Sequence, residues 1–263
     1  MSNPAEGYES YMVPTLFTPW ADHLIQGAHP REGERILDLG CGTGIVARQV
    51  ATRVGGGTVT AIDPSANMLT VARRAAERAG VNIEWHEGRA EALPFADERF
   101  DLVLSQFALM FFDDRPRALA EVHRVLGRGG RLSLNVWQGI DRHPFYRTLD
   151  RLIERKLGVG ALQSIFALGE PALLQGLLSD AGFQRIEIEP VSITSRFPHP
   201  AMFLAGEIEV DTAAIPAMQG LTVAERAAMV AAISEEMQAP LREVTRGDHV
   251  VIEFHANVAR AWR

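Results

Sequence analysis

The stretch that decides the fold is "ILDLGCGTGIVARQVA", residues 36–51. It begins with a mostly apolar run, typical of a strand buried on both faces. Gly40, Gly42 and Gly44 follow at alternate positions, and the apolar residues after them recur at helical spacing. Because glycine has no Cβ, the loop between this strand and this helix lets a ligand approach backbone amides directly. The stretch therefore predicts a ligand-binding loop.

Strands and helices continue to alternate up to residue 137. The apolar patterns predict further strands at 58–63, 81–88, 99–106 and 131–137, and helices at 64–80 and 115–130, the latter closed by glycines. Strands separated by helices imply crossover connections, which produce a parallel sheet with helices on both faces. We therefore expect a doubly wound α/β fold.

The pattern changes after residue 137. Residues 138–181 read as helices, 183–194 as a strand, 198–240 again as mostly helical, and "HVVIEFHANVARAW", residues 249–262, as a last strand. We interpret the helical segments as inserts that cap the carboxyl edge of the sheet.

Composition excludes several classes of protein. The chain has 263 residues, 47% of them hydrophobic and 22% charged, with a net charge of -7, so we expect one folded domain and no nucleic-acid partner. The single cysteine, Cys41, rules out an internal disulfide, and no cluster has the spacing of a metal site. With neither a signal peptide nor a long apolar segment, we expect a cytoplasmic protein without stable membrane insertion, as a monomer or homodimer.

The spacing of the glycines differs from that of two well-known nucleotide-binding loops. A dinucleotide-binding loop has glycines at its first, third and sixth positions, but the sixth position counted from Gly40 is Ile45. A phosphate-binding Walker loop ends in Lys-Ser or Lys-Thr, which is absent here. Both patterns fail, although a dinucleotide oxidoreductase stays a remote alternative.

The stretch "ILDLGCGTG" resembles the first motif of class I S-adenosylmethionine (SAM) dependent methyltransferases. Three more stretches resemble later motifs of that family in the same order: "VTAIDPSANML", "GRAEALPFADERFDLVLSQFALMFFDD" and "ALAEVHRVLGRGGRLSLNVW". The stretch "GRAEALPFADERFDLVLSQFALMFFDD", residues 88–114, is most similar to the branch that includes ubiquinone/menaquinone methyltransferases. The resemblance implies a Rossmann-like, mostly parallel seven-stranded sheet and SAM as cofactor. It implies an N-terminal helical lid at 1–30, a SAM-binding core at 31–137, a helical insert at 138–181, and last strands at 182–263 with a cap insert at about 198–240, within one domain.

Matching positions assign cofactor roles to individual residues. Asp38 would organise the loop near the methionine ammonium, and Asp63 would accept both ribose hydroxyls. The other residues that the resemblance places around the cofactor are Gly40, Gly42, Thr43, Gly44, Pro64, Met68, Arg89, Ala90, Gln106 and Phe107. The family often has Asp or Asn where this chain has Arg89, which lacks an acceptor for the adenine amino group.

The acceptor side is less defined. The resemblance places Tyr8, Tyr11 and Phe111 at a substrate pocket, with His143 and Tyr146 as further candidates for its wall. The tyrosines also suit a role as anchors of their segments to the core. His143 is a weak candidate for a general base and His199 is a second one; both histidines also suit purely structural roles. The Asn/Asp-Pro-Pro-aromatic motif of amino-methylating enzymes is absent. We therefore expect methyl transfer to an oxygen or carbon of a small, partly apolar molecule; a SAM-binding protein that does not transfer methyl groups is the alternative.

Overall fold

The computed structural model describes residues 4–55, 57–213 and 216–263. By their contacts the residues form two compact units. Unit 1 comprises the chain up to Trp137, Leu168–Val191 and Ala256–Arg263, and unit 2 comprises Gln138–Ala167 and Ser192–His255.

The sheet confirms the expected α/β class. Its strands are β1 (Arg35–Leu39), β2 (Thr58–Asp63), β3 (Glu84–Glu87), β4 (Phe100–Gln106), β5 (Leu126–Trp137), β6 (Gln184–Pro198) and β8 (His249–Trp262), in the order β3-β2-β1-β4-β5-β8-β6, with the short β7 (Thr245–Arg246) paired to β8. The pairs from β3 to β5 are parallel, and β8 runs antiparallel to β5. The strand order reverses between β1 and β4, which is where ligands bind in open α/β sheets.

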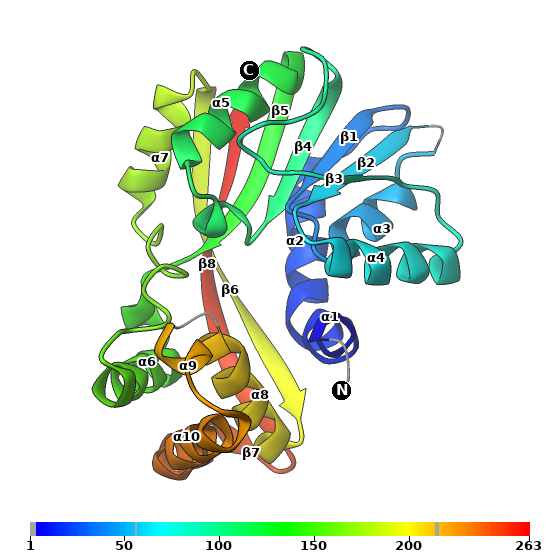
Figure 1. Ribbon diagram of the computed structural model, residues 1–263. Coiled ribbons are helices and arrows are strands. Elements are labelled where there is room, and N and C mark those ends of the chain that lie inside the picture. The colour runs from blue at the N-terminus through cyan, green and yellow to red at the C-terminus, as the bar shows by residue number, and fades with distance from the viewer. Residues whose placement is uncertain (1–3, 56, 214–215) are drawn as a thin grey trace. The chain divides into compact units, whose positions relative to one another are not determined.

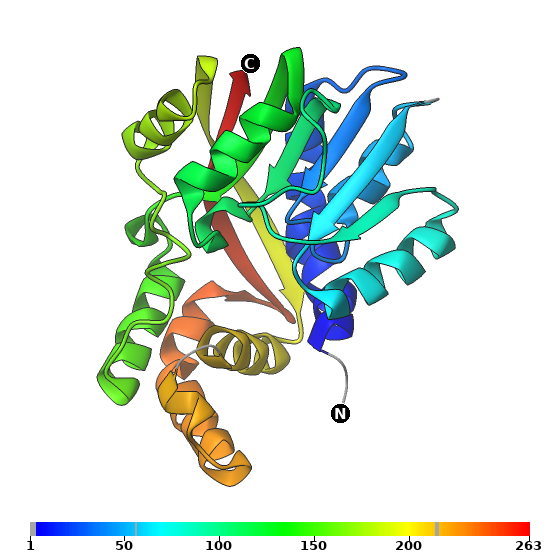
Figure 2. The same cartoon turned by 45° about the horizontal axis from the view of Figure 1, so that its top comes forward.

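Helices cover both faces of the sheet in unit 1 (Figures 1 and 2). One face carries α2 (Thr18–Ala28), α3 (Ile45–Ala51) and α4 (Ala66–Ala79), and the other carries α5 (Arg115–Val125) and α7 (Pro171–Asp180). Before α2 come α1 (Pro4–Gly7) and η1, a π-helix over Tyr8–Phe17. The N-terminal segment is thus helical throughout its described part.

The boundary between α5 and β5 differs from the expected one. The sequence predicts a helix to residue 130, whereas α5 ends at Val125, and Gly129 and Gly130 belong to β5. A Cβ on Gly130 would lie 2.8 Å from the carbonyl oxygen of Gly127, so these glycines serve close backbone packing at the start of the strand.

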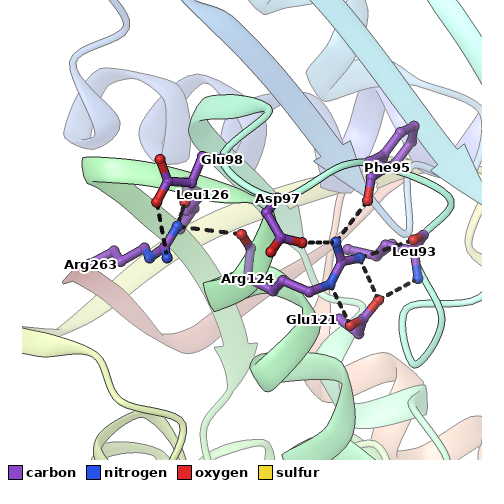
Figure 3. Close-up of polar contacts among 8 residues, drawn as sticks. All are labelled: Leu93, Phe95, Asp97, Glu98, Glu121, Arg124, Leu126 and Arg263. Carbon is purple, nitrogen blue, oxygen red and sulfur yellow. Dashed lines mark hydrogen bonds and ion pairs between the residues drawn. The ribbon is translucent and has the colours of Figure 1, made fainter.

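A hydrogen-bond network centred on the partly buried Arg124 fixes the loop between β3 and β4 (Figure 3). The Arg124 guanidinium donates to the carbonyl oxygens of Leu93 and Phe95, at 3.1 and 2.8 Å, and to the carboxylates of Asp97 and Glu121. Glu121 in turn accepts from the Leu93 amide at 2.9 Å. Hydrogen bonds to charged groups are the stronger class, so α5 holds this loop firmly.

Unit 2 has its own aromatic interior. Its helices are η3 (Ile140–Arg142), α6 (Pro144–Leu157), α8 (Pro200–Ala213), α9 (Pro216–Gln219), α10 (Val223–Glu236) and α11 (Gln238–Val244). The Phe197 ring lies 4.7 Å from Phe203 and 6.1 Å from Phe254, which is 5.6 Å from Tyr146. Among the described residues, no helix is both long and apolar enough to span a membrane.

Candidate functional site

The glycine loop joins β1 to α3 at the reversal of strand order. Gly40, Gly42 and Gly44 all have positive φ, at 68°, 54° and 80°, a region that other residues rarely adopt. A Cβ at Gly40 would lie 2.5 Å from the Cβ of Ala108, and one at Gly44 would lie 2.5 Å from the Trp85 ring. Around Gly42, by contrast, there is open space within 4 Å. The first and third glycines therefore allow close packing, and the second leaves the loop accessible.

Asp38 lies beneath this loop, near the end of β1. Its side chain is buried, and its Oδ2 accepts a hydrogen bond from the Ala47 amide in the first turn of α3 at 2.9 Å. Burial raises the pKa of Asp38 to about 7, the nearby charge of Asp63 acts in the same direction, and the Ala47 amide and Arg48 oppose it. This carboxyl group is therefore poised to gain or lose a proton near neutral pH.

Asp63, the last residue of β2, holds the loop from the other side. Its Oδ2 accepts from the Gly42 amide at 2.8 Å, and its Oδ1 accepts from the Ser65 amide at 2.9 Å. Burial raises the pKa of this carboxyl, while the two amides lower it. Since a carboxylate has about four acceptor positions, two stay available for a ligand.

The N-terminal segment reaches the same place. Tyr8 stacks on Phe17 with ring centroids 5.0 Å apart. Burial raises the pKa of the Tyr8 hydroxyl, and the negative charges of Asp63, Glu9 and Asp38 raise it further. Tyr8 thus lies close enough to Asp38 and Asp63 for their charges to act on its hydroxyl.

Glu9 and Arg48 belong to this site and were missed by sequence reasoning. Arg48 of α3 donates to the Glu9 carboxylate at 2.7 Å and also to the carbonyl oxygen of Thr43 in the loop. The two residues are 39 positions apart, and nothing in the local pattern pairs them. Glu9 directly follows Tyr8, and Arg48 lies four residues after Gly44. Their opposite charges near predicted site residues are the signal that could have found them.

Of the residues expected at the adenine side, Pro64 lies just before α4 and Met68 in its first turn, whereas Arg89 and Ala90 lie in the loop after β3. Pro64 is exposed and Met68 half-buried, while Ala90 is buried. Arg89 is more than half exposed and forms ion pairs with Asp113 and with Glu91. Its guanidinium is thus committed to carboxylates in the described chain.

Two expected residues at the end of β4 differ in their surroundings. Gln106 donates from Nε2 to the carbonyl oxygen of Phe17 at 3.2 Å, which ties β4 to the end of η1. Phe107 is buried, and its ring stacks on Trp137 at 3.6 Å and meets Trp20 edge-on at 5.4 Å. Phe107 therefore packs in an aromatic cluster at the foot of the site.

Of the expected substrate-pocket residues in unit 1, Tyr11 is half-buried in η1 and Phe111 is 62% exposed in η2 (Leu109–Phe111). Its neighbour Phe112 lies against the loop, 3.8 Å from where a Cβ on Gly40 would be. Of these two phenylalanines, Phe112 and not the expected Phe111 thus lies against the glycine loop.

His143 and Tyr146 lie in unit 2. His143 is buried, its Nδ1 pairs with the carbonyl oxygen of Gly139 at 3.3 Å, and its Nε2 accepts from the His255 amide at 3.1 Å. Burial lowers the pKa of His143 to about 4. Such an environment is that of a structural histidine, and the observed geometry gives no support to a role as base. His199 is exposed, ahead of α8.

Tyr146 has a buried titratable neighbour, Glu207, that sequence reasoning missed. Glu207 of α8 is buried and accepts a hydrogen bond from the Tyr146 side chain. Burial raises the pKa of Glu207 to about 7, against the opposing effect of that hydrogen bond.

Comparison with known proteins places this geometry in a family. Residues 37–134 match a family model described as a methyltransferase domain. The chain is 34% identical over 177 residues to the demethylmenaquinone methyltransferase of Thermus thermophilus, covering 62% of this chain and 80% of that protein. The chain belongs to the class I SAM-dependent methyltransferase family.

Further similarities agree with this assignment. The ubiquinone/menaquinone biosynthesis C-methyltransferase UbiE of Pectobacterium carotovorum is 32% identical over 183 residues, covering 64% of this chain and 73% of that one. The structure of phosphoethanolamine N-methyltransferase 2 from Haemonchus contortus, in complex with S-adenosylhomocysteine (SAH), superposes with a TM-score of 0.57 at 21% identity over 93% of this chain and 52% of that one. At that identity the superposition shows a shared fold. The expected family, its branch and its SAM cofactor are thereby confirmed.

The residues present fit SAM. The methyltransferase has an open loop surface at Gly42, spare acceptor capacity on Asp63, and a buried Thr43 hydroxyl without a hydrogen-bond partner. Buried polar groups normally have partners, so a hydroxyl of this kind suits a place where a polar ligand binds.

Proposed function

We propose that this SAM-dependent methyltransferase transfers its methyl group to an oxygen or carbon atom of a small, partly apolar molecule. The residues proposed to bind the cofactor are Asp38, Gly40, Gly42, Thr43, Gly44, Asp63, Pro64, Met68, Arg89, Ala90, Gln106 and Phe107. The observation that carries the cofactor site is the loop of three positive-φ glycines held by the Asp63 carboxylate at the end of β2. A cytoplasmic location and a monomeric or homodimeric state complete this proposal.

The division of labour between cofactor and protein follows from the chemistry. When bound, SAM supplies a methyl group on a sulfonium sulfur, which a nucleophile displaces directly. In the proposed site Asp63 orients the ribose, the glycine loop holds the methionine part, and Phe112 shields the neighbouring space from water. Holding two reactants in line can lower a barrier by roughly 7–11 kcal/mol, so positioning alone is a large contribution.

A cavity with a mixed polar and apolar lining supports a partly apolar acceptor. It has a volume of about 470 Å³ and is lined by Phe112, Pro116, Leu168, Leu173 and Leu177 together with Asp113, Asp114 and Arg115. Because Phe112 lines this cavity and also lies against Gly40, the cavity adjoins the cofactor loop. Its size falls within the usual range for small-molecule sites, and its mixed lining suits an apolar molecule with polar groups. One similar protein is a demethylmenaquinone methyltransferase and the other a C-methyltransferase of ubiquinone/menaquinone biosynthesis, which favours a carbon acceptor.

Calorimetric titration with SAM, SAH and NADH in parallel tests the cofactor site first. We expect micromolar binding of both SAM compounds and none of NADH. Radiolabelled methyl transfer to panels of phenols, carbon acids and amines then tests the acceptor class. Transfer to amines alone would refute the acceptor proposal, and cofactor binding without any transfer would favour a SAM-binding protein of another function.

The Asp63→Ala variant tests the site residue by residue. Loss of two hydrogen bonds from ribose hydroxyls to a charged acceptor should weaken SAH binding at least about 100-fold. Since Asp63 also holds the Gly42 amide, Asp63→Asn serves as the matched variant that keeps an acceptor oxygen without the charge. Unchanged affinity in a folded Asp63→Ala protein would contradict the site.

A further inference from the structure

A buried ion pair connects the N-terminal segment to the cofactor loop. The Arg48 Nη2 and the Glu9 Oε1 are 2.7 Å apart, and the two side chains are only 10% and 17% exposed. The same guanidinium donates to the carbonyl oxygen of Thr43. Two long charged side chains are rarely buried together without a specific purpose, because removing them from water costs several kcal/mol per ion.

The pair leaves one carboxylate oxygen unused. Glu9 Oε2 is buried and has no hydrogen-bond partner, and the same holds for the hydroxyl of Thr43, which is 1% exposed, and for Gln106 Oε1. These three atoms come from η1, the loop and β4, and their residues are joined through Arg48 and through the Gln106–Phe17 hydrogen bond. Unsatisfied buried acceptors in one region indicate that a ligand with several N–H donors completes them.

The charges of the region favour a cation. Three carboxylates, on Glu9, Asp38 and Asp63, act together on the Tyr8 hydroxyl, and Arg48 is the buried arginine that faces them. Arg73 and Arg78 also act on this region, but their side chains are exposed, where water and salt screen them. A bound cation with hydrogen-bond donors therefore gains both charge complementarity and partners.

We propose that Glu9 binds the α-ammonium group of the methionine part of SAM, and that Arg48 is a positioning residue that holds the Glu9 carboxylate against the loop. The inference rests on the cofactor site proposed above. A simpler possibility is that the ion pair only anchors η1 to α3. The two differ in which part of the cofactor feels the loss of Glu9.

The Glu9→Gln variant separates these possibilities when titrated with SAH and with 5′-methylthioadenosine, which has no amino-acid part. Glutamine can still accept from Arg48 but carries no charge. Loss of one charge-assisted hydrogen bond should weaken SAH binding about 10- to 100-fold and leave methylthioadenosine binding within about twofold. Equal losses for both ligands, or no loss for either, would overturn the role of Glu9.

Matched controls keep the result interpretable. Glu6→Gln removes a carboxylate from the same segment, where Glu6 pairs with Arg74 at 3.2 Å and both side chains are more than half exposed, so it should leave both affinities unchanged. Arg48→Gln should show the same selective loss for SAH as Glu9→Gln, and Glu9→Asp replaces Glu9→Gln if circular dichroism shows that the latter is unfolded. Failure of the unaltered protein to bind either ligand would refute the cofactor site as a whole.

Discussion

Titration of Asp38 should make cofactor affinity depend on pH. Burial raises the pKa of this carboxyl to about 7 in the protein without ligand, so the neutral acid predominates below pH 7 and the carboxylate above it. A ligand that carries an ammonium and a sulfonium cation favours the carboxylate. SAM binding should therefore strengthen as pH rises through 7 and should release a proton.

The magnitude follows from the ionised fraction. With a pKa of about 7, roughly 9% of the protein carries the Asp38 carboxylate at pH 6.0 and about 76% at pH 7.5. Since apparent affinity scales with the fraction in the binding-competent state, SAM should bind about eightfold more tightly at pH 7.5 than at pH 6.0. The α-amino group of the ligand has a pKa of about 8, so it stays mostly protonated up to pH 7.5, and the comparison stops at that pH.

Calorimetry at several pH values, in two buffers with different ionisation enthalpies, measures both the affinity and the released proton. Asp38→Asn should remove most of the slope, because the amide does not titrate and can still accept from the Ala47 amide. The residual slope then reports Asp63, whose pKa is also raised by burial. An affinity that is flat with pH, or an unchanged slope in Asp38→Asn, would refute the role assigned to Asp38.

Two further variants test the packing around the loop and the interior of unit 2. Gly44→Ala should lower the free energy of unfolding by about 2–5 kcal/mol in urea titrations, because the added methyl group meets the Trp85 ring and also imposes the strain of a positive φ. Gly33 has the same φ of 80° but open space around it, so Gly33→Ala should show only the cost of the strain. Equal losses in the two variants would contradict the packing explanation. The Glu207 carboxyl, whose pKa is raised from 4.5 to about 7, should weaken the native state as pH rises between those values. The change in the free energy of unfolding caused by Glu207→Gln should therefore be more favourable at pH 8 than at pH 5, by up to about 3 kcal/mol. A change that is the same at both pH values would contradict that ionisation.

The cofactor loop could be predicted from sequence because its determinants are local. Three glycines within five residues, after an apolar strand, specify positive φ values at Gly40, Gly42 and Gly44. Asp63 is assigned from the resemblance, and the parallel pairing of β2 with β1 explains why its side chain reaches the same sheet edge as the loop. The glycine spacing thus needs no contact between distant residues.

Contacts across the fold could not be predicted in this way. The Glu9–Arg48 pair depends on the path of η1. This segment is a π-helix, which no residue pattern in the sequence predicts. The end of α5 at Val125 depends on the pairing of Leu126 with Phe100 in β4, which draws the following residues into the sheet. In both cases tertiary partners decide the outcome between locally acceptable conformations.

His143 shows why a catalytic role is harder to predict than a binding loop. A histidine in sequence can be a base or a packed side chain, and only its surroundings distinguish the two. Here both ring nitrogens face backbone groups, and burial lowers the pKa to about 4, which leaves a weak base at neutral pH. The loop, by contrast, offers main-chain amides, which are present whatever the neighbouring side chains are. Recognition by backbone is therefore encoded in local spacing, whereas recognition of the acceptor depends on side chains that only the folded chain brings together.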